Sequence, residues 1–162
     1  MSLRAYPDMK TGGKAKIPRL TIAAWGLVLI AAVFFLQGWH SPKGNPVKQV
    51  RVGGAVVQAE VVQSPDKVAQ GLAGRRALDE GRGMLFLMPE RKRQVFWMQG
   101  MRFPLDIIWV DQGRIIGLER NVPPGEEHIV TSPEPAAQVL EVPAGFSERR
   151  ALKPGDKVTI GD

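Results

Sequence analysis

Residues 83–110, GMLFLMPERKRQVFWMQGMRFPLDIIWV, contain three short apolar runs separated by charged and proline-containing stretches. The runs cover residues 84–88, 95–98 and 107–110, so each has only four or five residues. Runs of that length, bounded by Gly, Pro and charged residues, favour buried strands over helices. The segment therefore predicts strands whose two faces are both covered.

The flanking sequence predicts further strands. Residues 56–62, VVQAEVV, alternate apolar and polar side chains with the period of a half-buried strand. Residues 111–114, DQGR, connect two apolar runs and indicate a hairpin. Two more short strands are expected over residues 138–142 and 157–160, whereas residues 120–135, with four prolines, are expected to form a long loop.

Helical signals are few. Ser64, Pro65 and Asp66 indicate the start of a short helix, with Ser64 as the N-cap and Pro65 at the first helical position. Residues 144–152, AGFSERRAL, can form one further helical turn. We therefore predict a mainly β fold, a compact single-domain β-sandwich or barrel with one or two short helices, preceded by an N-terminal transmembrane helix.

That transmembrane helix is expected over residues 20–39, LTIAAWGLVLIAAVFFLQGW, an uncharged and almost wholly apolar run. Twenty residues are about the length that a helix needs to cross a hydrocarbon core of ~30 Å. Five bases and one acid precede the run, and this excess predicts a cytoplasmic N-terminus and an extracytoplasmic domain. A cleaved signal peptide is the alternative, and its removal would leave a secreted domain.

We expect four parts in the chain: a basic cytoplasmic tail (residues 1–19), a membrane anchor (20–39), a linker rich in Pro, Gly and Lys (40–54) and a β domain (55–162). The formal net charge of +6 is +4 over residues 1–39 (five bases, one acid) and +2 over residues 40–162 (17 bases, 15 acids). Because the outer part is close to neutral, we expect no nucleic-acid partner.

Residue types that carry common chemistries are scarce. The chain has no cysteine, so no disulfide framework or lipoprotein anchor is expected. Its two histidines, His40 and His128, are too far apart in the sequence for metal-ligand spacing. We therefore expect neither a metal nor a cofactor, and the fold must depend on its apolar core.

Five motifs and a preceding segment resemble the DUF192 family. They are GMLF (83–86), FWM (96–98), PLD (104–106), VLEVPAG (139–145) and PGD (154–156), with QGLAGRRAL (70–78) upstream. The resemblance implies a compact, mainly β domain, often exported, in a family without an established activity. Family members commonly read FWMKNT where this chain has FWMQGM (96–101), so Gln99, Gly100 and Met101 supply less polar chemistry here.

Seven residues in or near these motifs are candidate ligand-binding residues: Trp97, Met98, Asp106, Arg75, Arg76, Arg102 and Glu141. Trp97 and Met98 are either core residues or a stacking platform for a sugar or base. A buried Asp106 needs a partner, so it either caps a turn or pairs with Arg75, Arg76 or Arg102. We expect Trp97, Met98 and Asp106 to lie close together.

We expect a binding module for a small molecule, a glycan or an envelope protein, attached to the membrane through residues 20–39. A hydrolase-type enzyme is the first alternative, in which Asp106 and Glu141 flank a substrate and act as an acid–base pair. A structural or assembly factor of the cell envelope is the second, and it would display an exposed apolar patch.

Overall fold

The computed structural model describes residues 44–161, and the compact unit begins at Asn45. The predicted cytoplasmic tail and membrane anchor lie outside the described residues. Within residues 44–161 no helix has both the length and the apolar character needed to cross a membrane.

Strands dominate the described part of the chain. Its elements are β1 (Val47–Val52), β2 (Ala55–Val62), α2 (Pro65–Gln70), β3 (Arg82–Lys92), β4 (Val95–Met98), β5 (Leu105–Asp111), β6 (Arg114–Val122), β7 (Gly125–Thr131), β8 (Ala136–Pro143), α3 (Phe146–Arg149) and β9 (Val158–Ile160). The prediction of a mainly β fold with two short helices is confirmed.

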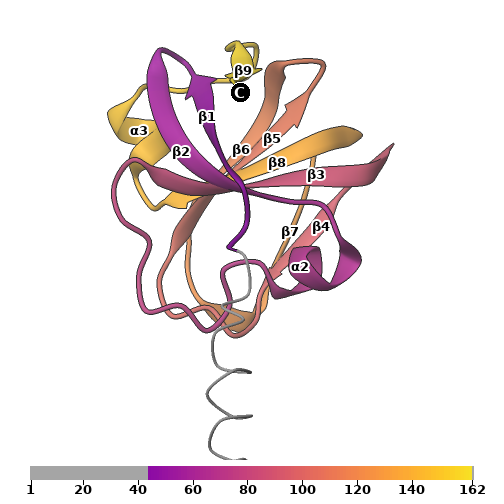
Figure 1. Cartoon of the computed structure of the whole chain (residues 1–162), viewed down its shortest axis with the longest axis vertical. Helices are drawn as coiled ribbons and strands as arrows, with labels where there is room; N and C mark the ends of the chain where they lie inside the picture. Colours follow the sequence, from indigo (N-terminus) through magenta and orange to yellow (C-terminus); the bar gives the residue numbers. More distant parts are fainter. Residues whose placement is uncertain (1–43, 162) are drawn as a thin grey trace, which may run out of the picture. The chain divides into compact units, whose positions relative to one another are not determined.

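Seven strands form one sheet in the order β6-β5-β8-β3-β2-β1-β9, and β4 and β7 form a separate two-stranded ribbon. Neighbours in the large sheet are antiparallel, except that β2 and β3 are parallel. The sheet curls like a half-barrel (Figure 1). A single bridge between Arg114 and Lys157 connects the start of β6 to the segment before β9.

Both faces of the curled sheet are covered. On the first face, Leu85, Ile108 and Leu140 belong to one buried apolar cluster. On the second face, Phe86 and Trp109 belong to another, to which β4 contributes Phe96 and Met98. Burial on both faces explains why β3 and β5 are continuous apolar runs, as the sequence predicted.

The linker prediction needs a correction, because Val47–Val52 forms β1 rather than a spacer. This strand pairs with β2 on one side and β9 on the other. Val50 and Val52 are fully buried. Only Val50, Arg51 and Val52 alternate apolar and polar side chains, and the Pro and Gly residues around the strand obscured this short pattern. The loop expected over residues 120–135 likewise contains β7.

Candidate functional site

A cavity of about 380 Å³ lies on the second face of the sheet. Its walls come from α2 and the turn after it, from β3 and β4, and from one residue of β8. The lining residues are Gln63, Pro65, Val68, Ala69, Gln70, Gly71, Leu72, Ala73, Phe86, Met88, Pro89, Val95, Phe96, Trp97, Gln99, Met101 and Glu141. We call this cavity the Glu141 pocket.

Helix α2 forms one wall of the pocket and has no fully buried residue. Pro65 stands at its first turn, and Gly71 ends it with a φ of 48°. None of its six residues is buried, although Leu72, directly after it, is 1% exposed. An isolated six-residue helix is unstable in water. Leu72 therefore anchors the helix, and Val68 both packs against the second apolar cluster and lines the pocket.

Aromatic side chains form a rigid layer beside the pocket. The rings of Phe86 and Phe96 are 5.0 Å apart and nearly perpendicular at 88°. Phe96 meets Trp109 in the same edge-to-face manner at 5.6 Å and 82°. Such pairs contribute roughly 0.5–1.5 kcal/mol beyond their buried area. The GMLF and FWM motifs thus meet across the second face.

Glu141 is the only ionisable side chain among the lining residues. It is 6% exposed, and its neighbours across the sheet are the apolar Met84 and Ile107. Its Oε2 atom has no hydrogen-bond partner. Burial without compensation disfavours the charged form and raises the pKa of the carboxyl to about 8. The carboxyl is therefore mostly protonated at neutral pH.

Asp106 is buried too, but it is fully engaged by the backbone. Its Oδ1 accepts hydrogen bonds from the N–H groups of Asn121, at 2.8 Å, and Gly145, at 3.1 Å. Its Oδ2 accepts one from the N–H of Ser147 at 2.7 Å. The prediction of an arginine partner is wrong, and the alternative of a turn cap is confirmed. We call this group the Asp106 lock.

The Asp106 lock depends on unusual backbone conformations. Asn121 and Gly145 both have positive φ, 52° and 76°, which Asn and Gly tolerate better than other residues. In this way the carboxylate joins the end of β6 to the turn between β8 and α3. The sequence contained the PLD and VPAG motifs but gave no sign that they meet.

Asp106 and Glu141 lie on opposite faces of the sheet. In the β5–β8 register Asp106 is paired with Val142, and Ile107 is paired with Glu141. Paired residues share a face and successive residues alternate, so the two carboxyls point away from each other. They cannot flank one substrate, and the predicted acid–base pair is wrong.

The remaining candidates are dispersed. Trp97 is 55% exposed and lines the pocket, so it lies at the rim, whereas Met98 is 1% exposed in the core. Because they alternate along β4, the expected group of Trp97, Met98 and Asp106 does not form. Arg76 and Arg102 are exposed.

Arg75 has a different partner from the one predicted. Its guanidinium contacts Glu60 in a bidentate ion pair, with N–O distances of 2.5 and 2.7 Å. Asn45 donates a further hydrogen bond to Glu60 at 3.0 Å. The Arg75 guanidinium holds the pKa of Glu60 below its ordinary value. This pair connects the turn after α2 to β2 and so positions the α2 wall of the pocket.

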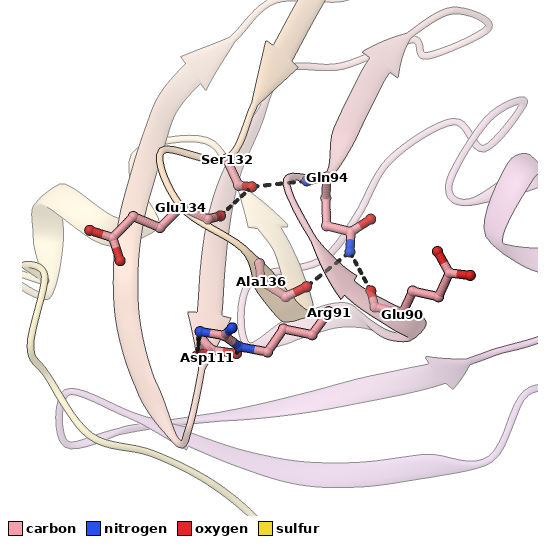
Figure 2. A network of polar contacts seen from close by, with 7 residues as sticks. All are labelled: Glu90, Arg91, Gln94, Asp111, Ser132, Glu134 and Ala136. Carbon is pink, nitrogen blue, oxygen red and sulfur yellow. Dashed lines mark hydrogen bonds and ion pairs between the residues drawn. The ribbon is translucent and has the colours of Figure 1, made fainter.

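A buried amide fixes the β4 wall, as Figure 2 shows. The backbone N–H of Gln94 donates to Ser132 Oγ at 2.9 Å. The Gln94 side-chain amide donates to the carbonyl groups of Glu90, at 2.8 Å, and Ala136, at 2.9 Å. Gln94 thus joins the end of β3 to β8 and to the β4–β7 ribbon. Sequence reasoning missed this residue because an isolated glutamine in a charged stretch carries no pattern.

Two further features limit the kinds of chemistry that the site can support. Among residues 44–161 no three His, Asp or Glu side chains gather closely enough to hold a metal ion. The large apolar side chains exposed on the β4–β7 ribbon are Val95, Trp97 and Ile129. Trp97 and Ile129 are cross-strand partners, so the apolar rim of the pocket continues onto the ribbon.

The sequence profile of DUF192, described as an uncharacterised ACR family, matches residues 48–160. The chain belongs to this family. The matched segment includes the Asp106 lock and every lining residue of the Glu141 pocket. The DUF192 motifs PLD and VPAG therefore serve the lock, whereas GMLF and FWM form the aromatic layer.

Two solved structures are similar to this chain. One is a protein of unknown function from Novosphingobium aromaticivorans DSM 12444, 33% identical, with a TM-score of 0.69 over 74% of this chain and 89% of that one. The other is described as a proposed transcription regulator from Sinorhizobium meliloti 1021, 32% identical, with a TM-score of 0.68 over 72% of this chain and 95% of that one. No curated protein matches the chain.

Proposed function

We propose that the protein is a binding module for a small ligand with an apolar body and one hydrogen-bond donor. The observation that carries this proposal is the unpaired Oε2 atom of Glu141 in an otherwise apolar pocket. A buried polar atom without a partner costs roughly 1–3 kcal/mol. Trp109 Nε1 and Ser147 Oγ are also buried without partners, but only Glu141 lines the pocket. A ligand donor aimed at Glu141 would remove that cost.

The size and walls of the pocket suit such a ligand. A cavity of about 380 Å³ lies within the usual range of small-molecule sites, roughly 300–1,000 Å³. Met88 and Met101 line it, and methionine side chains adapt to varied apolar shapes. An apolar ligand would add to the packing of α2, which contacts the core through Val68 and is followed by the buried Leu72.

We further propose that this module works outside the cytoplasm, attached to the membrane through residues 20–39. The length of the apolar run and the five bases before it support the proposal. The protein should stay with the membranes during a carbonate wash. Release into the supernatant would instead support a cleaved signal peptide.

Ligand binding can be tested with the full chain in lipid nanodiscs, with ¹³C-labelled methionine methyl groups. Met88 and Met101 line the pocket, whereas Met84 and Met98 do not and serve as internal controls. Titration with hexan-1-ol should shift the Met88 and Met101 signals in a saturable manner and leave the other methionine signals almost unchanged.

A matched pair of variants locates the effect in the pocket. Ala69→Phe places a large side chain on a lining residue of α2 and should abolish the hexanol response. Lys67→Phe adds the same side chain to an exposed, non-lining position of α2 and should leave the response intact. An equal response in both variants, or none in the native protein, would refute the proposed function.

A further inference from the structure

We propose that the natural ligand carries a primary ammonium group, which forms an ion pair with the buried Glu141 carboxylate in the pocket. The inference rests on the proposed function and names the polar chemistry of the same site. Its basis is the composition of the lining, in which the one ionisable side chain is an acid and no lysine, arginine or histidine is present.

The charges on surrounding elements do not replace a ligand cation. On the second face, the cross-sheet row that contains Glu141 also holds Glu60 on β2 and Glu119 on β6, each two strands away. Arg75, after α2, is already paired with Glu60. Arg82 lies on the same face of the neighbouring strand β3, but it is exposed, acts on Glu60 and does not line the pocket. The other charged residues of this region, on α2, in the turn after it and after β4, are also exposed and do not line the pocket: Asp66, Lys67, Arg76 and Arg102.

Further acceptors lie among the exposed lining residues of the pocket. An ammonium group has three N–H donors and no acceptor. Gln63, Gln70 and Gln99 line the pocket together with Glu141. The side-chain NH₂ of Gln99 donates to Glu126 at 3.3 Å, which leaves its amide oxygen as an acceptor. A ligand carboxylate or phosphate would find no lysine, arginine or histidine among the lining residues, and Glu141 would repel it wherever its own carboxyl is ionised.

Binding of an ammonium group must displace the proton of Glu141. The free carboxyl, whose pKa is about 8, is protonated at pH 6, and the ion pair requires its ionised form. One proton therefore passes to solvent for each ammonium ion bound. The dissociation constant should fall about 50-fold from pH 6 to pH 8, as the ionised fraction rises from about 1% to about 50%. It should rise again above about pH 10, where an alkylamine loses its own charge.

The test compares hexylamine, hexan-1-ol and hexanoate by the methionine signals of the full chain in nanodiscs. At pH 8 hexylamine should bind at least tenfold more tightly than hexanol, and hexanoate should not bind. The affinity of hexanol should change less than threefold between pH 6 and pH 8.

Two variants assign the preference to the pocket charge. Glu141→Gln should remove the advantage of hexylamine over hexanol, whereas Glu119→Gln, in the same cross-sheet row but outside the pocket, should preserve it. Gln99→Lys adds a cation to the lining and should weaken hexylamine binding at least tenfold. This second variant keeps the test decisive if Glu141→Gln does not fold.

The ammonium inference and the proposed function can fail separately. If hexanol shifts the Met88 and Met101 signals and hexylamine binds no more tightly at pH 8, the ammonium inference is wrong and the binding module stands. If Gln99→Lys leaves hexylamine affinity unchanged, the inference is also wrong. If none of the three compounds shifts these signals, both the ammonium inference and the proposed function are wrong.

Discussion

Asp106 and Glu141 lie on adjacent strands, both are nearly or fully buried, and their surroundings are opposite. Three backbone N–H groups surround the Asp106 carboxylate on the first face of the sheet. On the second face, Glu141 has apolar cross-strand neighbours and an Oε2 atom without a partner. The Asp106 carboxyl therefore stabilises the fold, whereas the unpaired Glu141 carboxyl lowers its stability.

Natural proteins break local rules mostly at functional sites, where stability is given up for activity or binding. The Asp106 carboxyl follows the rule that buried polar groups are hydrogen-bonded, and the Oε2 atom of Glu141 breaks it. The contrast gives the first region a structural role and is the reason for proposing ligand binding at the second.

The largest expected effect is at the lock. Asp106→Asn removes the charge and turns an NH₂ group towards backbone donors, so we expect the free energy of unfolding to fall by about 4 kcal/mol. Urea denaturation at pH 7 measures this loss. Asp79→Asn, at an exposed loop position, serves as the control and should change stability by less than about 0.5 kcal/mol. A similarly small loss for Asp106→Asn would remove the distinction between the two regions.

The second effect is the pH dependence caused by Glu141. The pKa of Glu141 is about 8 in the folded protein, above the ordinary value of 4.5. The contribution of this carboxyl to stability is therefore fully present below pH 4.5 and is lost as the pH rises through 8. Between pH 5 and pH 7 the native protein should lose about 2–3 kcal/mol of unfolding free energy from this group.

Glu141→Gln stays neutral at every pH and should abolish most of that loss, whereas Glu119→Gln should retain it. Urea denaturation at pH 5, 6 and 7 provides the comparison. If the free energy of unfolding falls equally steeply with pH in the native protein and in Glu141→Gln, Glu141 has a partner within the fold.

A third, smaller effect concerns Glu60, whose carboxyl has its partner in Arg75. Because the pKa of Glu60 is lowered in the folded protein, its stabilisation is present above about pH 4.5 and is lost as the pH falls below it. The pair is partly exposed, so Arg75→Ala should cost only about 1 kcal/mol at pH 7. The cost should vanish near pH 3, and an undiminished cost there would show that packing, not charge, is responsible.

The smallest effect on stability is expected at the rim of the pocket. Trp97 is 55% exposed, so Trp97→Ser should change the free energy of unfolding by less than about 0.5 kcal/mol. The variant should still weaken hexanol binding, as measured by the methionine signals. A large loss of stability would place Trp97 with the lock as a structural residue.

Sequence patterns predicted the elements better than the contacts. The apolar runs of β3 and β5 were correct because length and composition determine a doubly covered strand. β1 and β7 were missed because nearby Pro and Gly residues obscured their patterns. The residue type of Asp106 showed that it needs a partner, but the partner lies in backbone 15 to 41 residues further along the chain.

The site was only partly predictable for the same reason. Trp97 and Glu141 were candidates, and both line the pocket. Their joint position depends on the β5–β8 register and on where α2 packs, and neither is visible in a single sequence. The opposite orientation of Asp106 and Glu141 follows from that register alone.

The most direct test of the account is a pH titration of the Glu141 carboxyl carbon by ¹³C NMR, with and without hexylamine. We predict a midpoint near pH 8 for the free protein and a shift to lower pH with hexylamine bound, because the ammonium group stabilises the carboxylate. A midpoint near the ordinary value of 4.5, unchanged by hexylamine, would contradict the assignment of Glu141 as the ligand contact.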